Sequence, residues 1–210
     1  MAGKITALKR QVKRKDRVSV FIEGEYAFSL MESAAAVLSP GQYLSDEEID
    51  RLQQADLYQK AYHQALRYLG IRARSQAEME QYLTGKDYPP AVVAATLARL
   101  QREGYLNDAD FAGAWVDSRG RLKPKGKRAL QYELKQKGIA NELIESALAG
   151  LDEENLAWAA VESRLSRWKN LDDDRLKQKV WGFLARRGFD YEIARLTYEK
   201  VRAVLSNQDD

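Results

Sequence analysis

Hydrophobic and polar positions alternate in the first part of the chain. In RVSVFIEGEYAFSL the alternating apolar positions are Val18, Val20, Ile22, Tyr26, Phe28 and Leu30. Apolar side chains at every second position are typical of a half-buried β-strand, since successive side chains point to opposite faces. Gly24, which can adopt a positive φ, separates the two runs. The pattern predicts a β-hairpin, and the preceding segment 5–12 is a candidate for a further strand.

Two helix signals follow the hairpin. The segment MESAAAVL, residues 31–38, is typical of a short helix, and Pro40-Gly41 predicts a turn. Ser45 and Glu48 have the spacing of a capping box, in which each side chain bonds to a backbone N–H of the other residue. We therefore expect a helix that starts at residue 45 and continues through SDEEIDRLQQ.

Apolar residues recur at helical spacing from about residue 51, and the segments 82–100, 133–151 and 183–201 align without gaps. Equivalent apolar positions are Met79, Leu130 and Val180; Leu83, Leu134 and Leu184; Tyr88, Ile139 and Phe189; Val93, Ile144 and Ala194; and Leu100, Leu151 and Val201. Each segment passes a basic residue and turns at Asp87, Gly138 or Gly188. Glycine suits the left-handed residue that ends a helix.

A further helical stretch precedes each aligned segment, at residues 56–70, 108–120 and 152–168. Each repeat thus has three helices in about fifty residues. One such repeat buries little apolar surface alone, so neighbouring repeats must stack. The predicted fold is mainly all-α, a tandem array of three-helix repeats with a small N-terminal β-hairpin module. The expected boundaries are 1–50 for the module, 51–104, 105–151 and 152–205 for the repeats, and 206–210 for a tail.

Composition narrows the class of protein. The chain is 45% hydrophobic and 31% charged, with a formal charge of +3 and no cysteine. The absence of cysteine excludes disulfides and thiolate chemistry and favours a reducing compartment. No uncharged apolar run approaches the ~18 residues of a membrane-spanning helix, and the first residues lack the apolar core of a secretory signal. We expect a cytoplasmic monomer with no membrane partner.

Positive charge is concentrated in the segment 119–128, where no carboxylate occurs before Glu133. The six cations are Arg119, Arg121, Lys123, Lys125, Lys127 and Arg128. The helix breakers Gly120, Pro124 and Gly126 predict an irregular turn that displays them. One interpretation is a solvated loop between helices. The other is a contact with an anionic partner, because a positive patch gathers phosphates through counterion release without reading sequence.

Equivalent places in the other repeats are also basic. The additional candidate residues are Arg72, Arg74, Lys135, Lys137, Arg186 and Arg187. If the repeats stack regularly, equivalent loops fall on one edge, and the basic stripe suits a filament or a nucleic acid. The alternative is that Lys86, Lys137 and Arg187 only complement the C-termini of their helices.

Catalytic chemistry has little support. The chain has a single histidine, His63, and no Asp/Glu spacing matches a metal-binding loop. A glycine-rich phosphate loop and a nucleophile elbow are both missing, so we expect neither an enzyme nor a cofactor. Asn107 or Asp108 in GYLND is expected to cap a helix. The four tryptophans lie in amphipathic contexts that favour packing over base stacking.

Short motifs are spread over nearly the whole chain: RARS at 72–75 followed by EMxxYL, then GYLNDADFA, KGKRALQYELKQKGI and FLARRGFDYEIA. In combination they resemble the RecX family of bacterial regulatory proteins, and EGEYAFSL resembles the extended N-terminus of some members. The resemblance implies a tandem of three-helix units, in agreement with the repeat. Two positions depart from the commoner family pattern: Asp87 replaces a glycine, and Lys127 follows Lys125-Gly126 where proline is frequent.

The resemblance also implies a function in recombination, DNA repair and the SOS response. It implies a non-enzymatic regulator that binds the RecA–DNA filament and modulates, most often inhibits, its ATPase, strand-exchange and co-protease activities. Weak, sequence-independent contacts with DNA are expected as well. The alternative is a DNA-binding protein or transcription factor with helix-turn-helix-like repeats, although no helix offers an obvious base-reading face and the net charge is low.

Overall fold

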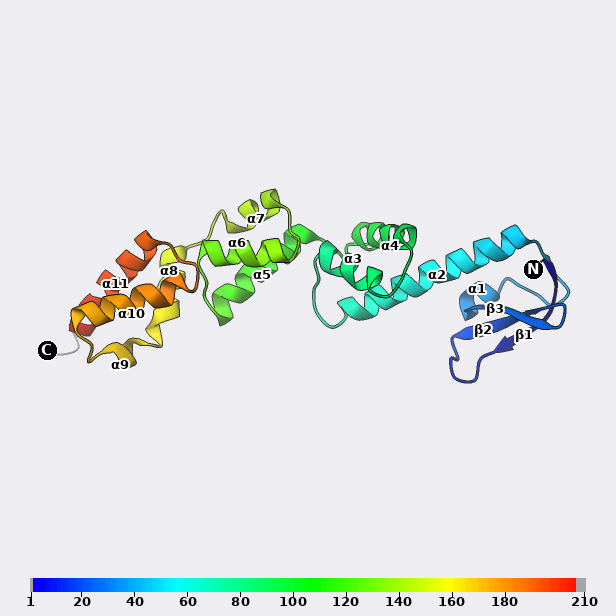
Figure 1. Ribbon diagram of the computed structural model, residues 1–210, viewed down its shortest axis with the longest axis horizontal. Helices are drawn as coiled ribbons and strands as arrows, with labels where there is room; N and C mark the ends of the chain where they lie inside the picture. The colour runs from blue at the N-terminus through cyan, green and yellow to red at the C-terminus, as the bar shows by residue number, and fades with distance from the viewer. Residues whose placement is uncertain (1, 207–210) are drawn as a thin grey trace. The chain divides into compact units, whose positions relative to one another are not determined.

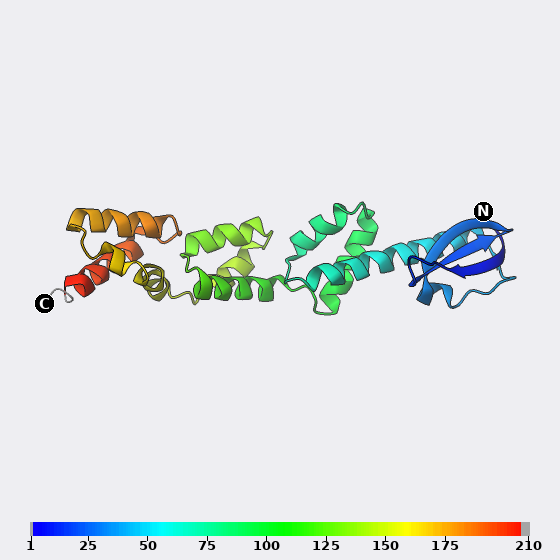
Figure 2. The same cartoon turned by 90° about the horizontal axis from the view of Figure 1, so that it is seen from below.

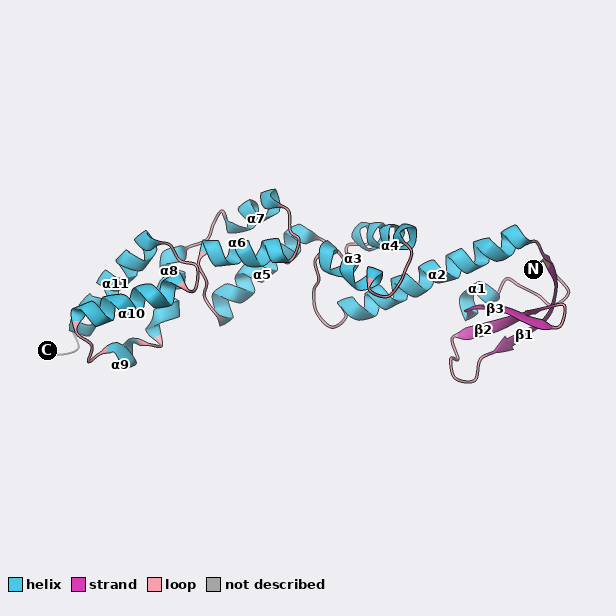
Figure 3. Ribbon diagram, in the orientation of Figure 1, coloured by secondary structure: helices cyan, strands magenta, loops and turns pink. Residues whose placement is uncertain are grey.

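A computed structural model describes residues 2–206, in which a small sheet precedes a series of helices (Figures 1 and 3). The strands are β1 Gly3–Arg10, β2 Arg17–Ile22, β3 Glu25–Met31 and β4 Tyr43–Leu44. The helices are α1 Glu32–Ala35, α2 Asp46–Leu69, α3 Gln76–Thr84, α4 Pro90–Arg102, α5 Asp108–Leu122, α6 Lys127–Gln136, α7 Asn141–Leu148, α8 Glu153–Glu162, α9 Leu165–Trp168, α10 Asp173–Ala185 and α11 Tyr191–Ser206. The expected tail, 206–210, lies outside the described residues except for Ser206, the last residue of α11.

The chain forms two compact units, which are described separately. The first contains the residues up to Arg72 together with Met79–Tyr105. The second contains Ala73–Glu78 together with the residues from Leu106 onward. The sheet and most of the first repeat therefore share one unit, and α2 runs without a break across residues 50 and 51.

The N-terminal sheet is antiparallel, with the strand order β3-β2-β1-β4. It extends the predicted hairpin, and the segment expected to add a strand does so as β1. Glu23 and Gly24 both have positive φ, at 49° and 89°, as a two-residue hairpin turn requires. The core of the module buries Ile5, Val20, Phe28 and Leu30 with apolar residues of α1 and α2.

One face assignment in the hairpin was wrong. Tyr26 is 55% exposed, although its alternation with Phe28 predicts burial. Val20 pairs with Phe28 whereas Phe21 pairs with Tyr26, so Ala27 is an extra residue in β3. Such a bulge shifts the alternation by one position, so Tyr26 before it and Phe28 after it lie on opposite faces. Tyr26 consequently makes an edge-to-face contact with Phe21, whose ring centroid lies 6.0 Å away.

A buried carboxylate joins the sheet to α2. Asp56 is 2% exposed and accepts hydrogen bonds from the backbone N–H of Met31 (2.7 Å), from Nη2 of Arg17 (3.1 Å) and from Nζ of Lys60 (2.6 Å). Burial by itself would raise the pKa of Asp56, but these donors outweigh it and hold that pKa below its ordinary value. Arg17 is 5% exposed, so its charge depends on this carboxylate for compensation. The capping box of Ser45 and Glu48 is confirmed at the start of the same helix.

The helical repeats bury the predicted equivalent positions. Leu83, Leu134 and Leu184 are all fully buried. The turns after them are confirmed as left-handed, with φ of 61° at Asp87, 73° at Gly138 and 80° at Gly188. Figure 2 shows the helices of the second repeat, in green, from a second direction. Its core consists of Phe111, Ala112, Val116, Leu130, Leu134, Ile139, Ile144 and Leu148.

Two helix boundaries differ from expectation. Gly120 does not end a helix, because α5 continues to Leu122 and the irregular turn is confined to residues 123–126. The stretch 152–168 is two helices, α8 and α9, rather than one. The break at Ser163–Arg164 lets Trp168 enter the core of the third repeat, where it contacts Phe183 edge to face with ring centroids 5.9 Å apart.

Two joints lie in the second unit, where the end of α6 contacts the start of α3 and the end of α10 contacts the start of α6. At the first, the hydroxyl of Ser75 donates to the carbonyl of Lys137 (2.6 Å), and a Cβ on Gly138 would lie 2.4 Å from Cβ of Ala77. At the second, the N–H of Gly126 donates to the carbonyl of Arg187 (2.9 Å). A Cβ on Gly188 would lie 2.4 Å from Cβ of Ala129. Both glycines therefore serve a positive φ and a close approach between repeats.

Candidate partner-binding surface

Glu133 neutralises part of the basic segment in the second repeat. Its carboxylate accepts from Nε of Arg119 (2.8 Å), from Nε1 of Trp115 (2.8 Å) and from Nζ of Lys125. Burial would raise the pKa of Glu133, but the hydrogen bonds from Lys125, Arg119 and Trp115 hold that pKa below its ordinary value. Arg119 also lies over the ring of Trp115, with Cζ 4.5 Å from the centroid. Arg119 therefore joins α5 to α6, Lys125 joins the turn to α6, and both side chains are half-buried.

The other four cations of the segment face solvent. Arg121 lies in the last turn of α5, Lys123 in the turn, and Lys127 and Arg128 in the first turn of α6. All four are exposed, and within residues 2–206 none of their side chains forms an ion pair. We call these four residues the exposed basic set. The carboxylate of Glu133 binds Arg119 and Lys125 instead, and Glu153 accepts from the backbone N–H of Lys127 (2.8 Å) rather than from its ammonium group.

Two further candidate residues are part of the joints between repeats. Nζ of Lys137 binds Glu78 (2.6 Å) and lies 5.3 Å from the centroid of Trp115. Nη1 of Arg187 donates to the carbonyl of Pro124 (3.0 Å), and its guanidinium lies over Phe183. Burial, followed by the charge of Arg164, lowers the pKa of Arg187 from its ordinary value. Both side chains are half-buried and stabilise the contact between successive repeats.

The remaining candidates differ in exposure. Lys135 and Arg186 are exposed at the ends of α6 and α10. Arg72 is exposed and Arg74 is half-buried in the segment that precedes α3. The joint places Arg187 against the turn that carries Lys123. The structure therefore brings the third repeat's helix end to the basic segment of the second.

The described part of the chain offers little support for a metal site or a membrane-spanning helix. His63 is exposed on α2, and residues 2–206 contain no group of three His, Asp or Glu side chains that could hold a metal ion. Over the same residues, no helix has both the length and the apolar character needed to traverse a bilayer. Asn107 caps α5 as expected, accepting from the N–H groups of Ala109 (3.0 Å) and Asp110 (3.3 Å).

The sequence reasoning missed the buried pair of Arg17 and Asp56. A signal was present, because Asp56 follows Ile49 and Leu52 at helical spacing and so occupies an apolar face. It also missed that Glu133 binds two of the six cations. That pairing joins different helices, so spacing along the chain does not reveal it.

Comparison with known proteins identifies the family. The profile of the regulatory protein RecX N-terminal domain matches residues 3–37. Profiles of the first, second and third three-helix domains of RecX match residues 61–100, 107–148 and 152–196. The chain belongs to the RecX family. Its members are named regulatory proteins, so a regulatory role follows for this chain as well.

Relatives and solved structures agree with this assignment. The chain is 33% identical to "Regulatory protein RecX" of Bacillus subtilis over 98% of this chain and 79% of that protein. It is 41% identical to that of Mycolicibacterium smegmatis over 71% of this chain and 82% of that protein. A crystal structure of regulatory protein RecX, 28% identical, superposes with a TM-score of 0.73 over 95% of this chain and 100% of the solved one. The tandem three-helix fold is thus confirmed.

Proposed function

We propose that this RecX protein is a non-enzymatic regulator that binds a RecA-type recombinase filament on DNA and inhibits its ATPase, strand-exchange and co-protease activities. Family membership supports the regulatory part of the proposal. The observation that supports this partner is the exposed basic set, which lies at the joint between two repeats and whose side chains form no ion pair within residues 2–206.

The proposed contact is electrostatic and extended. A recombinase–DNA filament repeats its surface along its axis and carries DNA phosphates, so it offers many equivalent anionic sites. Each three-helix repeat of this chain is a separate contact module, and contacts made by linked modules raise one another's effective concentration. Inhibition follows if a bound chain holds neighbouring protomers in one arrangement while turnover requires them to move.

The test is the single-stranded-DNA-dependent ATPase of a RecA-type recombinase. One variant replaces the exposed basic set with glutamine. A charge-matched control replaces four exposed cations of the first unit: Lys4, Lys15, Arg51 and Arg102. If each surface charge contributes about 0.4 kcal/mol, the first variant loses about 1.6 kcal/mol, so it should need about fifteenfold more protein for half inhibition. The control should inhibit as the unmodified chain does.

Several outcomes would reject parts of the proposal. If the unmodified chain leaves the ATPase unchanged at saturation, the recombinase assignment is wrong. If both variants lose inhibition equally, the net charge of the chain is responsible for inhibition, and the exposed basic set has no special role. Binding to bare DNA that is as tight as binding to the nucleotide-bound filament would favour the alternative, a DNA-binding protein or transcription factor.

A further inference from the structure

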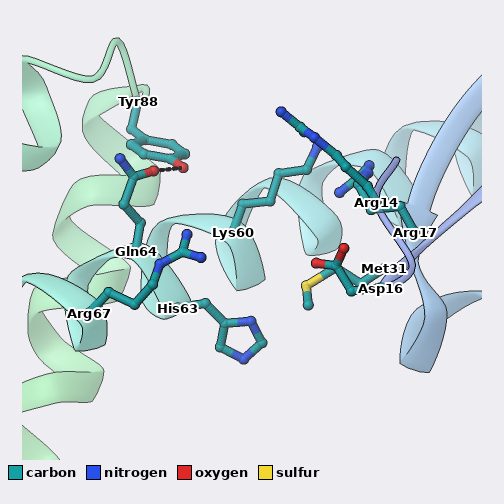
Figure 4. Close-up of a pocket in the computed structure, with 9 residues that line it drawn as sticks. All are labelled: Arg14, Asp16, Arg17, Met31, Lys60, His63, Gln64, Arg67 and Tyr88. Atoms are coloured by element: carbon teal, nitrogen blue, oxygen red, sulfur yellow. Dashed lines mark hydrogen bonds between the residues drawn. The ribbon is translucent and has the colours of Figure 1, made fainter. Parts of the chain in front are cut away.

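A polar cavity of about 420 Å³ lies in the first unit, between the sheet and the helices that follow it (Figure 4). Its lining residues are Arg14, Asp16, Arg17, Met31, Lys60, His63, Gln64, Arg67 and Tyr88. Figure 4 shows Arg14 and Arg17 on the sheet side, Arg67 and Tyr88 on the opposite side, and Lys60 between them. The volume falls within the ~300–1,000 Å³ typical of small-molecule sites.

The charges in this cavity are not balanced internally. Arg17 and Lys60 share the buried carboxylate of Asp56, which is not one of the lining residues. Arg14 and Arg67 are exposed, and within residues 2–206 no carboxylate pairs with either side chain. Four permanent cations therefore surround the cavity against the carboxylates of Asp16 and Asp56. Such an excess of positive charge in a concave site attracts an anion.

The cations are also fixed in place to different degrees. Asp56 anchors the Nζ of Lys60 at 2.6 Å, and the side chain of Lys60 remains 38% exposed. Among the described residues 2–206, the guanidinium groups of Arg14 and Arg67 form no hydrogen bond or ion pair, so their donors are available for a ligand. Guanidinium groups bind phosphate oxygens through two parallel hydrogen bonds, whereas an ammonium acts as a point charge. The combination suits a phosphate group better than a single carboxylate.

The ring of Tyr88 lines the side of the cavity opposite the sheet, and hydrogen bonds hold it in place. The hydroxyl of Tyr88 donates to Oε1 of Gln64 (2.9 Å), and Nε2 of Gln64 donates to the hydroxyl of Tyr82 (3.3 Å). Tyr82 stacks on Tyr68 with ring centroids 3.8 Å apart. This chain of contacts holds the half-buried Tyr88 at the cavity. Aromatic side chains at such positions stack on flat bases of any sequence.

We propose that this cavity binds a nucleotide, with its phosphates held by Arg14, Lys60 and Arg67 and its base placed against Tyr88. Asp16 is then available to accept a hydrogen bond from a sugar hydroxyl or a base amino group. The same chemistry occurs in a free nucleotide and in one unit of single-stranded DNA. The proposal requires no recombinase, so it stands or falls independently of the function proposed above.

Titration calorimetry of the full chain tests this site with three probes: ADP, inorganic pyrophosphate and a short oligothymidylate. The test variant carries Arg14→Gln and Arg67→Gln. The control carries Arg51→Gln and Arg102→Gln, two exposed cations of the same unit that do not line the cavity. Because each lost charged hydrogen bond weakens binding about tenfold, the test variant should bind at least one probe about a hundredfold more weakly. The control should bind normally, and circular dichroism should show equal helicity in all variants.

The probes distinguish the two sources of the nucleotide. Binding of ADP, with competition by pyrophosphate, supports a free nucleotide. If oligothymidylate binds and ADP does not, and if this binding is lost in the test variant but retained in the control, the cavity holds one nucleotide of a single DNA strand. The proposal is overturned if no probe binds, or if the test and control variants lose affinity equally. A separate Tyr88→Leu variant that leaves the affinity for ADP and oligothymidylate unchanged would also overturn it.

Discussion

The joint between Gly138 and Ala77 allows a direct energetic test. Replacing Gly138 with alanine adds a Cβ 2.4 Å from Cβ of Ala77, about 1 Å inside ordinary contact. The positive φ of 73° costs about 1–2 kcal/mol for a residue with a side chain. Overpacking costs about 1–3 kcal/mol more. Gly138→Ala should therefore destabilise the second unit by about 2–5 kcal/mol.

A compensating substitution separates these two contributions. With Ala77→Gly in place, the nearest atom to the new Cβ is Cα of residue 77, at 3.9 Å, so the clash disappears. Ala77→Gly alone should cost about 1 kcal/mol in helix propensity. The double variant should thus be more stable than the sum of the single effects predicts, by the overpacking energy of about 1–3 kcal/mol.

Urea unfolding followed by tryptophan fluorescence measures the cycle. All four tryptophans, at positions 115, 158, 168 and 181, lie in the second unit, so the signal reports on that unit. Strictly additive effects of the two substitutions would refute the contact between Gly138 and Ala77. Gly104→Ala supplies the comparison for φ alone, because Gly104 has a φ of 77° and open space around its Cβ position. Its effect, followed by circular dichroism, should be limited to about 1–2 kcal/mol.

Four further outcomes are expected. Asp56→Ala leaves the buried Arg17 uncompensated and should cost about 3–5 kcal/mol, with faster hydrogen exchange in β2 and β3, whereas the exposed Asp50→Ala should change little. Because the fold lowers the pKa of Asp56, its contribution to stability is present above about pH 4 and is lost as the pH falls through the folded value. Protection from hydrogen exchange, relative to the intrinsic rate at the same pH, should therefore fall near pH 3 in the unmodified chain but not further in Asp56→Ala. Glu133→Gln removes the charge that neutralises the basic segment, so filter binding should show tighter DNA binding with a steeper salt dependence. Asp87→Gly relieves a left-handed residue and should stabilise the first unit by up to about 1 kcal/mol in thermal unfolding.

The helical repeat could be predicted from the sequence because burial repeats with the same period. Met79, Leu130 and Val180 are all at most 1% exposed, as their alignment indicates. Positive φ at Gly138 and Gly188 was equally predictable, since few other residues adopt it. These features depend on local spacing and on one residue at a time.

The features that escaped prediction depend on contacts between distant segments. The bulge at Ala27 depends on the pairing of two strands, and the break before α9 depends on where Trp168 fits in a core. The sequence identifies which residues are basic, but it does not reveal which of them are paired with another group in the folded chain. Arg187 illustrates this limit, because its backbone and side chain both hold the turn of the preceding repeat. The roles proposed for the exposed basic set and for Arg72, Arg74, Lys135 and Arg186 remain predictions for experiment.

The joints have a consequence for engineering. At Gly126–Arg187 a backbone hydrogen bond and the side chain of Arg187, which donates to the carbonyl of Pro124, make the contact, and the glycine at 188 contributes no side chain. The geometry of such a joint requires small residues at a few positions and leaves the outward-facing helix surfaces free to vary. Whole three-helix blocks exchanged between homologues should therefore fit together if each donor keeps its glycine and each acceptor keeps a small residue. Chimaeras assembled in this way could transfer a recognition surface without redesign of a hydrophobic interface.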